Sequence, residues 1–275
     1  MYTQPQTRAD AKPVTIPQLA KMKQSGDKIA CLTAYDASFA ALVDAAGVDI
    51  VLVGDTLGMV VQGHSSTLPV TVDDVVYHCR MVGRGLRRAL LIADMPFLSY
   101  TEPAQALENA GRLMREAGAA MVKLEANANQ VAVVQHLAGN GVPVCAHLGL
   151  RPQSVHKIGG FKVQGKEDAA AQAMIDDALA LEAAGADIVL LECVPSALGR
   201  EITKRVSAPV IGIGAGPDTD GQILVLYDML DITPGRRPRF SKNFMAEAGS
   251  PRAAVEAYVQ EVRSGAYPAP EHCFD

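Results

Sequence analysis

Eight short runs of Val, Ile and Leu recur along the chain, and they constrain its fold more than any other feature. They lie at residues 29–34, 50–54, 90–94, 121–125, 143–148, 187–192, 209–214 and 223–228. Apolar and polar residues do not alternate within them, as they would in a strand with one face in water. Continuous apolar runs are typical of parallel strands that are buried on both faces.

Most of these runs are separated by Ala-, Leu- and Glu-rich stretches with helical spacing. The clearest lie at 36–47, 71–86, 102–118, 128–140, 168–185 and 196–206. A strand followed by a helix, repeated about eight times, predicts an α/β fold, the (β/α)₈ or TIM barrel. An open doubly wound sheet is the less favoured alternative, because no break in composition divides the units. The weakest link is the segment DTDGQ, which allows at best one short turn between the last two strands.

The remaining segments complete this barrel. Residues 15–26 predict a helix that closes the bottom of the barrel, and residues 250–265 predict a last amphipathic helix before a short tail. We therefore expect residues 1–275 to form a single barrel domain with a flexible arm at about residues 1–14.

Composition excludes several functional classes. The 25 Lys and Arg residues are outnumbered by 30 Asp and Glu residues, aromatics make up 5%, and Trp is absent. An acidic chain with few aromatics argues against a nucleic-acid partner. No apolar run approaches the ~20 residues that a membrane span needs, so we expect no membrane association. Five widely spaced cysteines without a C-x-x-C motif indicate buried free thiols in a reducing, cytoplasmic compartment.

Polar residues follow nearly every apolar run. Because chemistry in a barrel is located at the C-terminal ends of the strands, these residues are candidates for a site. Several carboxylates converging on one mouth would repel each other unless a cation lay among them, which is the physical argument for a metal. The residues in question are Asp36, Asp55, Asp94, Lys123, Glu125, His147, Glu192 and Asp228.

An oxygen-only ligand set of Asp55, Asp94 and Glu125 suits Mg²⁺ and does not suit Zn²⁺. Acids at strand ends are also frequent helix caps. For Asp36, which opens the helical stretch DASF, the cap is the favoured interpretation. Asp55 and Asp94 precede loops instead, so we favour a functional role for them.

Lys123 and Glu125 lie two positions apart in one strand, so their side chains point the same way. They suit a site for an anionic carbonyl substrate, with a structural ion pair as the alternative. His147 is either functional or a core histidine. Glu192 follows a wholly apolar strand, where burial would raise its pKa toward that of a general base, although a helix cap or a pair with Lys is also possible. The Gly-rich loop at 211–216 is compatible with backbone packing, a phosphate contact or a pteridine contact.

At these residues the chain resembles the ketopantoate hydroxymethyltransferase family. The matching stretches cover nearly the whole chain in the family's order. They are LTAYDASFA, VLVGDTLGMVVQGHSSTLPVTVDD, ADMPFLSY, VKLE, AHLGLRPQSV, LLECVP, VIGIGAG, DGQILVLYDMLDI and VRSGAYPAPEHCF. The resemblance implies a barrel of the phosphoenolpyruvate/pyruvate superfamily and a homo-oligomer, a decamer of paired pentamer rings. It also implies Mg²⁺-dependent transfer of a hydroxymethyl group from 5,10-methylenetetrahydrofolate to 3-methyl-2-oxobutanoate through an enolate, giving 2-dehydropantoate for pantothenate synthesis.

The matching motifs also imply roles for individual residues. Asp55 and Asp94 are the expected metal ligands with Glu125 close by through water; Asp55, Thr56, Asp94, Lys123 and His147 are expected at the substrate, and Glu192 is the expected general base. The chain departs from the family at Thr56, where Ser is usual, and at Ser65, where the family commonly has Asp. The hydroxyl kept at Thr56 should preserve substrate binding.

Two other classes remain open from the sequence. One is a Mg²⁺-dependent lyase or mutase of the same superfamily that acts on a 2-oxo acid without folate. Enzymes of that kind often carry a reactive Cys on a flexible loop, and no Cys here lies in such a loop. The other is a non-catalytic scaffold barrel, which would not need so many charged residues at one mouth.

Overall fold

The computed structural model describes residues 12–233 and 235–275. Eight parallel strands close into a barrel in sequence order, with β1 hydrogen-bonded to both β2 and β8. The strands are β1 (Ile29–Thr33), β2 (Ile50–Val53), β3 (Leu90–Asp94), β4 (Met121–Glu125), β5 (Val144–Gly149), β6 (Ile188–Glu192), β7 (Val210–Ile213) and β8 (Gly221–Leu224). The predicted (β/α)₈ barrel is therefore confirmed, and the open sheet is excluded.

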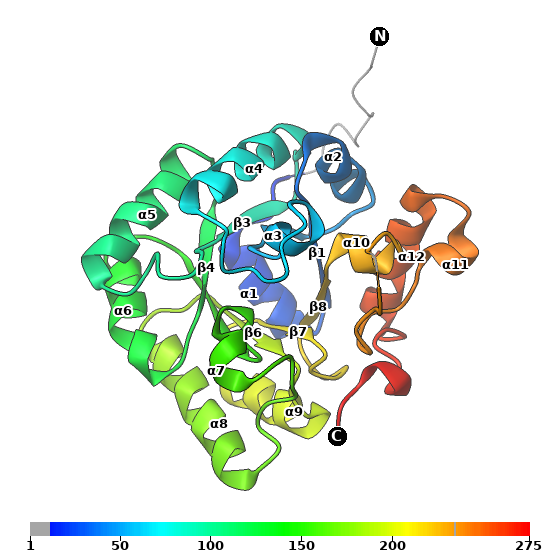
Figure 1. Cartoon of the computed structure of the whole chain (residues 1–275). Coiled ribbons are helices and arrows are strands. Elements are labelled where there is room, and N and C mark those ends of the chain that lie inside the picture. Colours follow the sequence, from blue (N-terminus) through cyan, green and yellow to red (C-terminus); the bar gives the residue numbers. More distant parts are fainter. Residues whose placement is uncertain (1–11, 234) are drawn as a thin grey trace.

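Helices surround the ring of strands, as Figure 1 shows. The longer ones are α1 (Ile16–Ser25), α2 (Ala37–Ala45), α4 (Val72–Gly85), α5 (Pro103–Arg115), α6 (Val131–Gly139), α8 (Asp168–Ala183), α9 (Ser196–Arg205) and α12 (Pro251–Ser264). Four single turns lie in the loops: α3 (Leu57–Val60), α7 (Val155–Ile158), α10 (Leu226–Met229) and α11 (Met245–Ala248). No helix is assigned between β7 and β8, as the short DTDGQ connection predicts.

Helix α1 covers the N-terminal end of the barrel, as predicted. Its Lys23 ammonium donates to the carbonyls of Thr203 and Ala208 and lies 2.9 Å from Asp220, all of which precede β7 or β8. Figure 1 shows α1 behind the ring of strands. With this end covered, a ligand has access from the opposite, C-terminal end.

The eighth strand begins two residues earlier, and ends four residues earlier, than the run that was predicted to form it. The apolar run at 223–228 was expected to be the eighth strand, but β8 ends at Leu224 and the rest of the run enters α10. The run stays apolar beyond the strand because Leu226 of α10 is also buried, as is Met229 just after the run. Asp228 consequently lies in α10 rather than at the end of a strand.

The predicted arm at residues 1–14 lies mostly outside the described residues. Of its last residues, Val14 is buried and donates its N–H to the carbonyl of Arg88. Within the described ranges, no helix is both long and apolar enough to cross a membrane. All five cysteines are free, and four of them are buried.

Candidate active site

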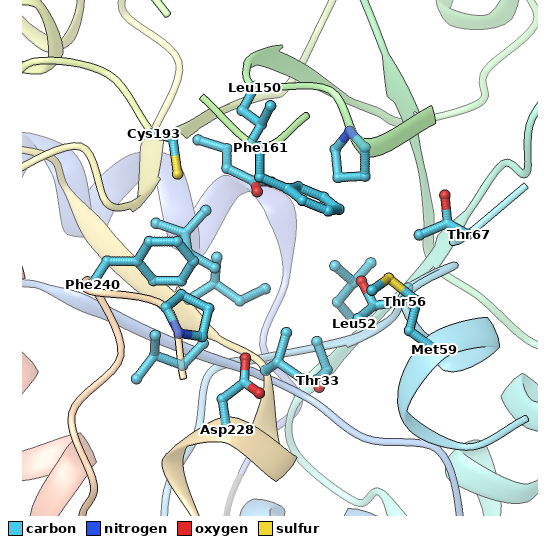
Figure 2. A pocket seen from close by; sticks show the side chains of 18 of the residues that line it. Thr33, Leu52, Thr56, Met59, Thr67, Leu150, Phe161, Cys193, Asp228 and Phe240 are labelled. Atoms are coloured by element: carbon cyan, nitrogen blue, oxygen red, sulfur yellow. The ribbon is translucent and has the colours of Figure 1, made fainter. Parts of the chain in front are cut away.

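A cavity of about 550 Å³ opens at the C-terminal ends of the strands. The seven residues that the sequence singled out for substrate, metal or base roles all line it, namely Asp55, Thr56, Asp94, Lys123, Glu125, His147 and Glu192. They come from β2 to β6 and the loops that follow, so the strand order alone brings them to one mouth. Figure 2 shows the cavity from close by, with Thr56 pointing into it from the turn before α3.

Asp55, Asp94 and Lys123 form the polar floor of this cavity. The Lys123 ammonium lies 2.6 Å from Oδ1 of Asp94, while Oδ2 of Asp94 accepts the N–H of Asp55 at 3.1 Å. Apart from this ion pair, the buried Oδ1 of Asp94 has no partner among the described residues. Oδ2 of Asp94 therefore holds the start of the loop at Asp55, and Oδ1 faces the Lys123 ammonium.

Opposite charges compete with burial in this floor. Burial raises the pKa of Asp55 well above its usual range, and the neighbouring Asp94 raises it further, while Lys123 opposes both. For Lys123, burial alone would lower the pKa, but the carboxylates of Asp94, Asp55 and Glu125 outweigh it and raise that pKa. Three acids therefore face one lysine, and the excess of negative charge favours an added cation.

Gln153 links two of the acids, and it was not predicted from the sequence. Its amide donates to Oδ2 of Asp55 at 2.8 Å and its backbone N–H donates to Glu125 at 2.9 Å. The Tyr100 hydroxyl donates to the amide oxygen, which fixes the orientation of the amide. No polar periodicity marks a buried glutamine in a loop, so only the RPQS segment after the fifth run could have suggested it.

Burial also acts on Glu125. Although Lys123 and the N–H of Gln153 favour its charged form, burial dominates and raises the pKa of Glu125 to about 8. The predicted common direction of Lys123 and Glu125 is confirmed, since both side chains line the cavity.

Glu192 and His147 face each other across β5 and β6. The His147 Nε2 atom lies 3.2 Å from the Glu192 carboxylate, and its Nδ1 atom lies 3.5 Å from the Lys123 ammonium. Burial and Lys123 lower the pKa of His147 well below its usual value, so the imidazole is neutral at pH 7. Burial raises the pKa of Glu192 to about 8, which makes its carboxylate a stronger base than an exposed glutamate.

A close approach of two strands makes this pair possible. Gly149 at the end of β5 has φ +89°, and a Cβ there would collide with the carbonyl of Glu192. Only a glycine lets β5 and β6 pair up to their last residues, Gly149 and Glu192.

The outer part of the cavity is largely apolar. Figure 2 shows Leu150, Phe161 and Phe240 around it. Gly214 of the Gly-rich loop supports this wall, because a Cβ there would lie 2.9 Å from Phe274 and 3.0 Å from Phe240. Of the interpretations left open for that loop, the structure supports backbone packing.

Asp36 is placed differently from the other strand-end acids. Its carboxylate accepts the N–H groups of Ser38 and Phe39 and caps α2, which confirms the cap interpretation. Asp228 lines the cavity from α10.

The donor set fits a hard divalent cation. All three acids offer oxygen, and the buried Oδ1 of Asp94 has the Lys123 ammonium as its one partner among the described residues. The described residues contain no group of three or more His, Cys, Asp or Glu side chains placed to hold a metal ion. That finding is compatible with Mg²⁺, which is usually held by one or two carboxylates together with water and substrate oxygens.

Comparison with known proteins decides the family. The model for ketopantoate hydroxymethyltransferase matches residues 13–270. The chain belongs to the ketopantoate hydroxymethyltransferase family. It is 60% identical over 276 residues to the 3-methyl-2-oxobutanoate hydroxymethyltransferase of Alkalilimnicola ehrlichii, which covers 100% of this chain and 99% of the relative. It is also 60% identical over 262 residues to the enzyme of that name from Halorhodospira halophila, with 95% of both chains covered.

Solved structures share the fold at low identity. A phosphonomutase from Burkholderia cenocepacia superimposes with a TM-score of 0.60 at 19% identity, covering 79% of this chain and 95% of that one. A phosphonopyruvate hydrolase, solved with oxalate and Mg²⁺, gives a TM-score of 0.59 at 14% identity over 94% and 93% of the chains. Membership of this family shows that the chain is an enzyme, a hydroxymethyltransferase. The scaffold alternative is therefore wrong, and the family gives no support to the lyase or mutase alternative.

Proposed function

We propose that this hydroxymethyltransferase transfers a hydroxymethyl group from 5,10-methylenetetrahydrofolate to 3-methyl-2-oxobutanoate, giving 2-dehydropantoate, with Mg²⁺ as its metal. The observation that carries the proposal is the convergence of all seven predicted site residues on one cavity in a chain of this family. We also propose that it acts in the cytoplasm as a homo-oligomer, with the decamer as the predicted assembly.

Asp55 and Asp94 are the residues proposed to hold Mg²⁺, with Glu125 beside them. When bound, Mg²⁺ supplies a Lewis acid that makes the C3 proton of the 2-oxo acid easier to remove. The hydrogen bonds that Gln153 gives to Asp55 and Glu125 fix these two carboxylates in place. The position of Asp94 Oδ1, which faces the Lys123 ammonium and accepts no other hydrogen bond among the described residues, supports the same assignment.

Glu192 is the proposed general base, and Lys123 stabilises the charge that develops on the 2-oxo oxygen. The Glu192 carboxylate is 15% exposed, so it lies at the cavity surface while still being a strong base. Lys123 remains charged near neutral pH because three acids surround it. The deprotonated C3 carbon forms a bond to the methylene carbon of the folate donor. Both bonds from that carbon to the folate nitrogens are broken, and water supplies the hydroxyl group, so that tetrahydrofolate is the leaving group. Thr56 and His147, which line the cavity, border the bound acid in this proposal.

Exchange of the C3 proton of 3-methyl-2-oxobutanoate with solvent deuterium, followed by NMR, tests this function. We expect exchange that needs Mg²⁺ but no folate, and product only when 5,10-methylenetetrahydrofolate is added. Glu192→Gln should bind Mg²⁺ and the acid normally but lose exchange. Full turnover by Glu192→Gln would contradict the assignment of Glu192 as the base. A wild-type enzyme that neither exchanges the C3 proton nor binds Mg²⁺ would contradict the proposed mechanism.

A further inference from the structure

Asp228 is a buried carboxylate in the cavity for which the proposed chemistry has no use. It lies in α10, is 8% exposed, and lines the same cavity as the polar floor. Figure 2 shows its carboxylate pointing into the cavity. A carboxylate that is buried in this way needs partners, because an unpaired charge is costly away from water.

The partners that the chain itself provides are few. Within the described residues, the side-chain hydrogen bond to Asp228 comes from the Thr233 hydroxyl, 2.6 Å from Oδ1. Arg237 lowers the pKa of Asp228 electrostatically, but its ion pair is with Asp231 at 3.2 Å, and burial keeps the pKa of Asp228 raised. Since a carboxylate offers about four lone-pair positions, it retains acceptor capacity toward the cavity.

The walls around Asp228 suit a flat ring. Leu224 and Val225 precede α10, and Pro238 and Phe240 lie in the segment that follows it, so all four line the cavity. A cavity of about 550 Å³ falls within the range of sites for drug-sized ligands, and the small 2-oxo acid at the polar floor leaves much of it for a second molecule. The cavity is also lined by further polar residues, so it combines apolar walls with a small number of polar groups, which is the usual composition of a ligand site. These further polar residues are Thr33, Thr233, Arg236, Arg237 and Arg239.

We propose that Asp228 binds the 2-amino-4-oxopyrimidine edge of the pteridine ring of the one-carbon donor. That edge presents two neighbouring donors, the ring N3–H and the 2-amino group, which match the two oxygens of a carboxylate. The inference rests on the proposed folate donor and names the part of the cavity that recognises it. With this edge at Asp228, the one-carbon end of the ring extends toward the polar floor.

The test compares Asp228→Asn with wild type in two assays. Asn still accepts the hydrogen bond from Thr233 but replaces one carboxylate oxygen with an N–H₂ group, which cannot accept from the ring. We expect KM for 5,10-methylenetetrahydrofolate to rise about 10- to 100-fold, the cost of losing hydrogen bonds to a charged group. Mg²⁺-dependent deuterium exchange of the 2-oxo acid, which needs no folate, should stay within twofold.

Thr233→Val is the matched control, because it removes the loop hydrogen bond and leaves the carboxylate in place. Its KM for the folate should change less than threefold. Asp228→Glu, which keeps the charge, should recover part of the lost affinity and provides a second variant if Asn disturbs folding.

The two proposals fail in different ways. An unchanged folate KM in Asp228→Asn, an equal rise in Thr233→Val, or an equal loss of deuterium exchange would each overturn the role of Asp228. A wild-type enzyme that exchanges the C3 proton but gives no product with 5,10-methylenetetrahydrofolate would instead overturn the folate donor, and the ring site with it.

Discussion

The acids at the N-terminal end of the barrel and those at its C-terminal end are similarly buried, but they differ in their partners. Before β2, Asp49 is 0% exposed; at the end of β3, Asp94 is 1% exposed. Asp49 accepts the N–H of Ala30 in β1 and pairs with two arginines, Arg88 and Arg263, whereas Asp94 pairs with a single lysine, Lys123, which also faces Asp55 and Glu125. Burial alone therefore does not separate a structural acid from a functional one.

The partners at the N-terminal end follow a pattern. At three of the four even-numbered strands, β2, β6 and β8, the acid that precedes the strand accepts an N–H from the strand before it: Asp49 from Ala30, Asp187 from Val144, and Asp220 from Val210. These acids join neighbouring strands at their start. At the other end, the carboxylates face each other and one lysine, an arrangement that is costly for the chain and useful for binding a cation.

Asp55→Asn tests most directly whether the acids at the two ends of the barrel differ in their effect on activity and stability. Removing one proposed metal ligand should lower kcat/KM by about 10³-fold, the scale of losing a main electrostatic contact in a site. The free energy of unfolding without Mg²⁺ should be unchanged or higher, because a poorly compensated buried charge is removed and Asn can still accept from Gln153. Steady-state kinetics and urea unfolding measure the two effects.

Asp49→Asn is the matched control at the opposite end. It leaves Arg88 without its carboxylate and should lower the free energy of unfolding by about 2 kcal/mol. Activity per folded molecule should stay within twofold. If Asp55→Asn destabilised the enzyme as much as Asp49→Asn while keeping its activity, the two ends would not differ in the way described.

The pH dependence of the free energy of unfolding also tests how the buried acids at the C-terminal end behave. Burial raises the pKa of Glu125 and of Glu192 to about 8, above the value of about 4.3 in an unfolded chain. Between pH 6.5 and 7.5 the folded state thus binds more protons at these groups, so the free energy of unfolding should fall as pH rises. His147 opposes this effect in part, because its lowered pKa keeps it neutral in the folded state while an unfolded histidine, with a pKa of about 6.5, still binds a fraction of a proton at the lower end of that window. One histidine offsets only part of the effect of the two glutamates.

The expected change is up to about 1.4 kcal/mol per pH unit for each such proton. Urea unfolding at pH 6.5 and 7.5 in a metal chelator measures it, and a double variant, Glu125→Gln with Glu192→Gln, should show a smaller change. Stability that rises with pH in the wild type would contradict the pKa directions assigned to the C-terminal end.

The sequence predicted the barrel because buried parallel strands and amphipathic helices have different hydrophobic periods. It misplaced the eighth strand because Leu226 and Met229 continue the apolar run into a helical turn that is itself buried. The convergence of the candidate site residues could be predicted because each lies near or just after the C-terminal end of a strand, and strand order fixes where those ends meet. Gln153 could not, since its position depends on how one loop folds back over Glu125.

Asp36 gives the smallest effect and the strictest test, because it lies at the C-terminal end yet has partners like an N-terminal acid. Its carboxylate accepts two N–H groups of the first turn of α2. Asp36→Ala should therefore lower the free energy of unfolding by about 1 kcal/mol, the usual cost of losing a helix cap, and leave kcat/KM within twofold. Thermal unfolding and steady-state kinetics measure both. A large loss of activity at unchanged stability would mean that position at this end of the barrel, rather than the set of partners, decides which acids are functional.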